Sequence, residues 1–180
     1  MRALRPAIVL LVGFFVVMLP VAAGHCESPQ FTAELLEFEQ AKSPPAEVIS
    51  QYEKLISDLK ELGDLGDTKF LALYVDLNSS TKGLFVRVET PALCSAGGQC
   101  PTDLYDVSTK QPRRLLSVIA QNIALQTGGD IVAAPGEQFP NILTNIPPDD
   151  VEAHTNRIIN PTAGKLWKWN GEQYKPTKWQ

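Results

Sequence analysis

Residues 91–101 read Pro-Ala-Leu-Cys-Ser-Ala-Gly-Gly-Gln-Cys-Pro and place two cysteines around a short loop with a Gly-Gly pair. Gly97 and Gly98 allow the positive φ angles that such a tight closure needs. We therefore predict a disulfide between Cys94 and Cys100. The disulfide either stabilises the chain where it leaves a strand, as disulfides of small exported domains mostly do, or shapes the loop for recognition of a partner. The recognition residues would then be Ser95, Ala96, Gly97, Gly98 and Gln99.

Two helices are predicted ahead of the loop. The first covers residues 28–41, where apolar side chains recur at helical spacing. The second covers residues 43–62, with Ser43 as N-cap, Pro44 at the first helical position and Gly63 as the C-terminal cap.

Between the second helix and the loop, the apolar period changes from 3.6 to 2. The alternation predicts a strand over residues 70–77 that is apolar on both faces, which suggests a central position in its sheet. A return strand over residues 84–89 has Arg87 and Glu89 on its outward face. This hairpin leads directly into the loop.

Downstream of the loop, strands and turns predominate. Short strands are predicted over residues 104–107 and 130–134. Residues 115–126 fit either a helix or a strand, and the alternation of apolar residues favours one long, bulged strand. Residues 135–161 are rich in Pro, Asn and Asp, which predicts a long surface loop.

The C-terminal stretch has the strongest hairpin signal. Asn170-Gly171 separates two apolar-aromatic segments and fits a two-residue type I′ turn. Trp167 and Trp169 fall on one face of the strand before it, where they would stack on a sugar ring, anchor a protein contact, or close the core. Packing in the core is the favoured interpretation.

The N-terminus predicts export. Two arginines precede an apolar run over residues 7–19, and small residues follow, which is typical of a secretory signal peptide over residues 1–24. Cleavage after Ala23 or Gly24 fits equally well, and an uncleaved anchor is the less favoured alternative. Cys26 then lies near the new N-terminus without a predicted partner. We expect a periplasmic or secreted protein with no membrane attachment after cleavage, in a compartment where disulfides form.

Length and composition indicate one ordinary globular domain. The chain has 180 residues, of which 44% are hydrophobic and 20% charged. We expect an α+β domain over residues 25–180, with N-terminal helices packed on a mainly antiparallel sheet and one small disulfide-closed loop.

Residues for catalysis and metal binding are scarce. His25 lies at the cleavage site, so His154 is the one histidine in the body of the chain, and no Ser-His-Asp, Cys-His or zinc set is predicted. Asp149, Asp150 and Glu152 lack the spacing of a calcium loop, and neither Gly-Gly pair opens a phosphate loop. We expect no cofactor, no metal and no catalytic residue that the sequence singles out. Two carboxylates brought together by the fold remain the route to an enzyme.

The charge distribution argues against nucleic acid as a partner. The formal net charge is −4, and loss of Arg2 and Arg5 with the signal peptide takes it to −6. Residues 34–67 are acidic, and the residues after 153 are basic. These segments are either solvated faces or contacts for a basic partner and an anionic polymer.

The order of helix, hairpin, Cys-loop and closing Trp-Asn-Gly-Glu-Gln-Tyr is similar to small exported bacterial proteins with one antiparallel sheet, most of them of unknown function. The disulfide-closed loop resembles, more distantly, that of periplasmic lysozyme inhibitors, which insert such a loop into an enzyme cleft. This loop lacks the histidine that those inhibitors carry between their cysteines.

The resemblance, together with the lack of a catalytic or metal-binding set that the sequence singles out, favours an exported, non-enzymatic binding protein. An inhibitor or immunity protein acting on an envelope-targeting enzyme would be an example. Its partner would be a protein of the envelope or extracellular space. The alternatives are a small secreted hydrolase or carbohydrate-acting enzyme that uses carboxylates, and a structural component of the envelope. The sequence does not set the oligomeric state.

Overall fold

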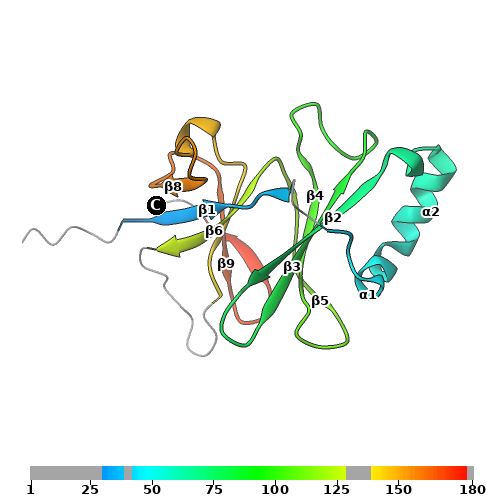
Figure 1. Ribbon diagram of the computed structural model, residues 1–180, viewed down its shortest axis with the longest axis horizontal. Helices are drawn as coiled ribbons and strands as arrows, with labels where there is room; N and C mark the ends of the chain where they lie inside the picture. Colours follow the sequence, from blue (N-terminus) through cyan, green and yellow to red (C-terminus); the bar gives the residue numbers. More distant parts are fainter. Residues whose placement is uncertain (1–29, 39–41, 129–138, 178–180) are drawn as a thin grey trace, which may run out of the picture.

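The computed structural model describes residues 30–38, 42–128 and 139–177, which form two antiparallel β-sheets and a short helical region (Figure 1). The four-stranded sheet has the order β2-β3-β4-β5, with bounds Lys69–Asp76, Lys82–Glu89, Cys100–Asp106 and Arg113–Ala120. The six-stranded sheet has the order β10-β9-β7-β6-β1-β8, with bounds Tyr174–Thr177, Lys165–Trp169, Ile142–Thr144, Ile123–Gly128, Thr32–Leu35 and Arg157–Ile159. The described residues therefore combine helix and antiparallel sheet, as an α+β class requires, with sheet predominating.

The predicted helix over residues 43–62 is present but begins later. It consists of α1 (Ala46–Ile49), η2 (Ser50–Tyr52) and α2 (Glu53–Leu62), and the short η3 (Leu65–Asp67) follows. Gly63 caps α2 with a φ of 81°, as predicted. The N-cap is Pro45, in an extended conformation and without a side-chain cap. Ser43 is not the cap because Pro44 cannot be the first helical residue: it precedes Pro45, and a residue that precedes proline is disfavoured in the α region.

The helix predicted over residues 28–41 is wrong in its described part. Residues Thr32–Leu35 form β1, which pairs with β6 on one side and β8 on the other. Both partners lie about 90 or more residues away in the sequence. The spacing of apolar residues within this segment fits a helix and contains no information about distant strands. Pairing with β6 and β8 makes the segment a strand. Residues 39–41 lie outside the described part of the chain.

The four-stranded sheet is covered on both faces. On β3, Leu84, Val86 and Val88 pack with Val48 and Tyr52 of the helical region. The alternate residues of β3 face the six-stranded sheet, where Phe85 joins a cluster drawn from both sheets. A third apolar cluster lies within the six-stranded sheet and the segments that cover it, and it consists of Ala33, Ala124, Leu143, Ile146, Ile158 and Leu166.

The predicted strand over residues 70–77 is an edge strand, not a central one. β2 pairs along its length with β3 alone, and its other edge receives a single bridge from Lys42 to Ala72. Its two apolar faces arise because helix covers one and the six-stranded sheet covers the other. Burial of both faces therefore does not require strands on both edges.

Residues 115–126 are extended, as favoured, but they form two strands in different sheets. β5 ends at Ala120 and β6 starts at Ile123, so the chain crosses from one sheet to the other at Gln121 and Asn122. The Asn122 side chain fixes this crossing, because its Nδ2 donates to the Ile146 carbonyl (2.9 Å) and its Oδ1 accepts from the Ile146 amide (2.8 Å).

The long surface loop predicted over residues 135–161 is wrong where the structure describes it. Residues 142–144 form the fully buried strand β7 between β6 and β9, and the 3-10 turn η4 (Pro148–Asp150) and β8 follow. A three-residue strand is too short to show a side-chain period of two. The Pro, Asn and Asp residues on either side of it therefore predicted a loop over the whole segment. The strand predicted over residues 130–134 lies outside the described residues.

The C-terminal hairpin is confirmed as β9 and β10, although its turn differs. Tyr174 pairs with Trp169, so four residues connect the strands instead of two. Asn170 holds this turn by accepting hydrogen bonds from the amides of Glu172 and Gln173 at its Oδ1. Among the described residues, no helix has the length and apolar character needed to span a membrane.

Candidate functional site

The predicted disulfide is present. Cys94 and Cys100 are bonded, with their Cα atoms 4.3 Å apart, and Cys100 is the buried first residue of β4. The bond therefore closes the connection between two neighbouring central strands. A disulfide indicates an oxidising, non-cytoplasmic environment.

The residues between the cysteines form an exposed and well-defined turn, which we call the cysteine loop (Ser95–Gln99). The Ser95 amide donates to the Gln99 carbonyl, and the Gly98 amide donates to the Ser95 carbonyl, both at 2.9 Å. The Ser95 hydroxyl accepts from the Gln99 amide at 3.2 Å. Of the two glycines, only Gly98 has a positive φ, at 74°. The five predicted binding residues thus lie together on one small projection.

Arg87 anchors the cysteine loop to the body of the protein. Its side chain is buried, and its Nη2 donates to the Gly98 carbonyl at 2.8 Å. Its Nη1 donates to the carbonyls of Gln121 (3.0 Å) and Ala120 (3.3 Å), and its Nε donates to Glu89 (3.0 Å). One guanidinium therefore links the loop to the point where the chain crosses between the sheets.

Sequence reasoning placed Arg87 on an outward face, and that prediction was wrong. The face of β3 that carries Phe85 and Arg87 meets the six-stranded sheet, which the sequence did not reveal as a second sheet. An arginine on an alternating strand looks solvated unless the element that covers it is known. No local signal in the sequence distinguishes it.

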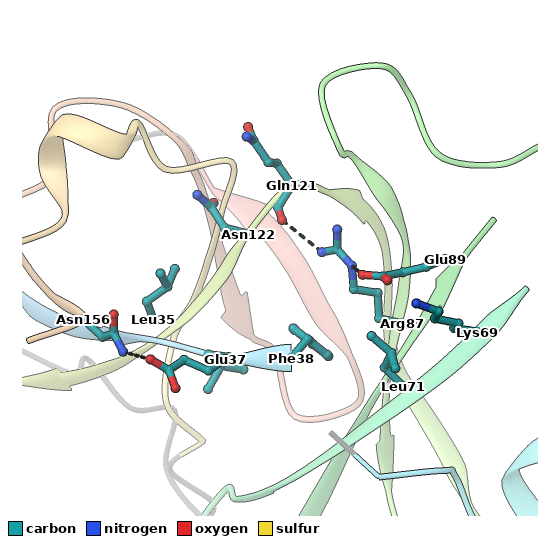
Figure 2. A pocket seen from close by; sticks show the side chains of 11 residues that line it. Leu35, Glu37, Phe38, Lys69, Leu71, Arg87, Glu89, Gln121, Asn122 and Asn156 are labelled. Atoms are coloured by element: carbon teal, nitrogen blue, oxygen red, sulfur yellow. Dashed lines mark hydrogen bonds and ion pairs between the residues drawn. The ribbon is translucent and has the colours of Figure 1, made fainter. Parts of the chain in front are cut away.

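A cleft of about 680 Å³ opens between the two sheets beside Arg87 (Figure 2). We call it the inter-sheet cleft. One wall comes from the four-stranded sheet through Lys69, Leu71 and Glu89. The other comes from the segment at the end of β1, with Leu36, Glu37 and Phe38. Asn122 and Asn156 also line the cleft, and the Arg87 guanidinium lies 5.7 Å from the centre of the Phe38 ring.

The charges of the inter-sheet cleft are balanced. Lys69 and Glu89 are direct neighbours across the β2–β3 ladder, and Glu89 also accepts from Arg87. Glu37 accepts a hydrogen bond from the Asn156 side chain. Figure 2 shows Glu37 and Asn156 at one end of the cleft, Lys69 and Glu89 at the other, and Phe38 between them. The lining therefore holds two acids and two bases around an apolar middle.

A second hollow of about 540 Å³ joins this cleft to the cysteine loop. Lys69 and Glu89 line both spaces, and Ser95 and Ala96 line the second. The cysteine loop, the hollow and the inter-sheet cleft therefore form one continuous face.

The tryptophans lie apart from that face. Trp169 packs against Phe139 and Tyr174, with ring centroids 4.6 and 5.5 Å away, and Arg113 lies 5.9 Å from its ring. Arg113 starts β5, whereas Ala120 at the other end of β5 pairs with Cys100. The hairpin and the cysteine loop thus lie at opposite ends of the four-stranded sheet (Figure 1).

Both tryptophan side chains are part of the packing. Trp167 donates from Nε1 to the Thr144 hydroxyl at 3.0 Å, and Lys165 lies 4.4 Å from its ring. Both rings are partly buried against the cluster shared by the sheets. Their placement favours the interpretation that they close the core.

The other candidate residues do not gather into a site. His154 is exposed in a turn with a φ of 71°, and Asp150 accepts hydrogen bonds from Thr162. Within residues 30–38, 42–128 and 139–177, no three His, Cys, Asp or Glu side chains group closely enough to hold a metal ion.

Removal of the disulfide is expected to cost about 2 kcal/mol of unfolding free energy, because the crosslink restricts a short loop of the unfolded chain. The comparison is between oxidised parent and a Cys94→Ser/Cys100→Ser variant in urea unfolding. Since Arg87 still holds Gly98, the variant should retain the parent's circular dichroism spectrum. An unchanged unfolding midpoint would contradict the expectation.

Thr90→Val is expected to stabilise the protein by about 1 kcal/mol. Thr90 is 3% exposed, and its hydroxyl oxygen is buried without a hydrogen-bond partner. Valine has nearly the same shape and removes the cost of keeping that hydroxyl away from water. Thermal unfolding measures the effect. Thr102→Val is the matched control, because the buried Thr102 hydroxyl donates to the Cys100 carbonyl, and its removal should not stabilise.

Comparison with known protein families found no family model that matches the chain. Searches of curated proteins and of solved structures found no significant match either. The cysteine loop and the adjoining cleft are therefore the features of the protein that bear on its function.

Proposed function

We propose that this protein is an exported, non-enzymatic binding protein that inserts its cysteine loop into a cleft of a protein partner. The partner belongs to the periplasm or the extracellular space, and an envelope-targeting enzyme is the favoured class. The protein would then act as its inhibitor or immunity protein. The signal peptide expected over residues 1–24 and the disulfide support this location.

One observation carries the proposal: all five residues of the cysteine loop are exposed to solvent, and yet bonds within the loop and to the body of the protein restrain its conformation. The disulfide closes its base, the Ser95 and Gln99 backbones pair across it, and Arg87 binds Gly98 from beneath. A free loop loses conformational entropy when a partner immobilises it, whereas a loop ordered in advance loses little. Such a projection is suited to insertion into a concave site.

The experiment is quantitative binding by matched variants. The oxidised mature protein is used to capture partners from its native envelope extract, and the captured protein is then purified and its Kd measured directly. In the test variant, Gly-Ser residues replace Ser95–Gln99 while both cysteines stay. In the control, the same replacement is made at Thr109–Gln111, a turn at the opposite end of the four-stranded sheet.

The proposal predicts that the loop variant loses at least about 100-fold in affinity, as expected when a central anchor of an interface is removed. The turn control should keep the parent's Kd. Equal affinity of both variants would place the interface elsewhere and overturn the proposal. Absence of any stoichiometric partner would also overturn it and favour a structural role in the envelope.

A second candidate, a carboxylate-dependent hydrolase or carbohydrate-acting enzyme, is favoured by one feature. Glu37 and Glu89 both line the inter-sheet cleft. Each already accepts a hydrogen bond, from Asn156 and from Arg87 respectively. If the cleft were catalytic, Glu37→Gln or Glu89→Gln would abolish hydrolysis of a glycan panel and leave partner capture unchanged. The binding proposal expects no hydrolysis by the parent protein.

A further inference from the structure

We infer that the inter-sheet cleft binds a short peptide with free, charged ends and apolar side chains. This site is separate from the cysteine loop in its ligand and its chemistry, so the inference goes beyond the proposed function. The free ammonium group would lie at Glu37, the free carboxylate at Lys69, and the apolar side chains between Phe38 and Leu71.

The dimensions of the cleft suit a small ligand. Its volume of about 680 Å³ falls within the range of about 300–1,000 Å³ typical of small-molecule sites. Its walls belong to two different sheets, and the crossing between them is pinned by Asn122. A site built between rigid elements keeps its shape, which limits the entropy that binding costs.

The charged groups along the cleft match a peptide bound in one orientation, with its N-terminus at Glu37 and its C-terminus at Lys69. The Glu37 carboxylate, with Asn156 bonded to it, lies at one end, and the exposed Lys69 ammonium lies at the other (Figure 2). A carboxylate accepts several hydrogen bonds, so Glu37 keeps its contact with Asn156 while accepting from an ammonium group. Phe38 and Leu71 supply apolar contact in the middle.

Arg87 forms part of the floor of the inter-sheet cleft and does not bind the carboxylate of the peptide. Three backbone carbonyls and Glu89 already occupy most of its donors. That leaves the Lys69 ammonium, which lies opposite Glu89 on the ladder, as the cation most open to a ligand. Because the acids and bases of the cleft balance, a zwitterion is favoured over a polyanion. The Phe38 ring is 9% exposed, with Arg87 over its face, so it offers the cleft a small apolar contact and no open face on which a sugar could stack.

The test uses the tripeptide Ala-Leu-Ala and the same peptide acetylated at its N-terminus, amidated at its C-terminus, or both. Binding to the oxidised mature protein is measured by calorimetry and by amide chemical shifts. The free peptide should bind with a Kd below about 1 mM. Acetylation and amidation should each weaken binding by about 10-fold, because each removes one charged contact.

Variants then locate each end of the peptide. Glu37→Gln should bind free and acetylated peptides equally, and Lys69→Gln should bind free and amidated peptides equally. Glu47→Gln and Lys110→Gln are the matched controls, since both residues line a separate hollow near α1 and should leave all four affinities unchanged. The cysteine-loop variant should also bind the tripeptide, which separates this inference from the proposed function.

Three results would overturn the inference. They are no binding of the free tripeptide at millimolar concentration, equal binding of free and doubly blocked peptides, and loss of affinity in the control variants as large as in Glu37→Gln and Lys69→Gln. Each of these outcomes leaves partner capture by the cysteine loop to be judged by its own experiment.

Discussion

Replacement of Arg87 by methionine is expected to lower the free energy of unfolding by about 3–5 kcal/mol. Methionine keeps the packing of the stem but removes every donor of the guanidinium. The carbonyls of Gly98, Ala120 and Gln121 then lose their shared partner. Ala120 lies in the core with no exposed surface, so water cannot replace the lost bond there without opening the structure.

Urea unfolding of the oxidised protein measures this effect, and Glu89→Gln is the matched control. That variant changes one partner of Arg87 but leaves the three carbonyl bonds intact, and the Glu89 side chain is 38% exposed. We expect the control to lose no more than about 1 kcal/mol. Amide exchange adds a local readout. Arg87→Met releases the Gly98 carbonyl, and the loosened turn should then speed exchange of the Gly98 amide, which donates to the Ser95 carbonyl. A loss as small as the control's would show that Arg87 is not the anchor of the loop.

The protein is also expected to lose stability steeply above about pH 10. Burial raises the pKa of Tyr52 above its ordinary value near 10, and the negative charge of Asp103 raises it further. Burial likewise raises the pKa of Tyr105 and of Tyr174. The Tyr52 hydroxyl donates to Asp103 at 2.7 Å and ties the helical region to the four-stranded sheet.

The loss of stability with rising pH follows from the difference in proton binding between the folded and unfolded states. Below about pH 10, these tyrosines are protonated in both states, and their contribution is fully present. Above it, they ionise in the unfolded chain while the folded protein keeps them protonated, so unfolding releases protons and becomes easier. Each tyrosine contributes a slope of at most about 1.4 kcal/mol per pH unit, reached where it is ionised in the unfolded chain and protonated in the folded protein.

Urea unfolding at a series of alkaline pH values tests this expectation. Tyr174→Phe removes one of the three groups and should reduce the slope by that group's share, whatever its effect on stability at neutral pH. A slope that is unchanged in Tyr174→Phe, or a parent protein whose stability does not fall above pH 10, would contradict the assignment.

The sequence alone predicted the features that depend on neighbouring residues. The disulfide lies between Cys94 and Cys100, and α2 ends at Gly63. The β2–β3 hairpin is where alternation predicted it, and the β9–β10 hairpin is where Asn170-Gly171 predicted it. Each depends on a local property, such as ring closure, the freedom of glycine at positive φ, or a side-chain period of two. Such properties are readable without knowledge of the rest of the fold.

The features that depend on distant partners were missed. β1 was predicted as a helix because its partners β6 and β8 are remote in sequence, and β7 was taken as part of a loop because three residues carry no period. One predicted strand became β5 and β6 in two sheets, since nothing local marks the crossing at Gln121. Strand pairing is a non-local interaction, so its partners are chosen by the tertiary fold.

The candidate site divides in the same way. The sequence by itself determined the cysteine loop, because the spacing of two cysteines around Gly97-Gly98 specifies a closed and exposed turn. Only the tertiary structure decided that Arg87 is buried beneath that loop and that an inter-sheet cleft lies beside it. The physical reason is that a second sheet must cover β3 before Arg87 loses water, and that sheet combines β1 with strands that follow β5 in the sequence.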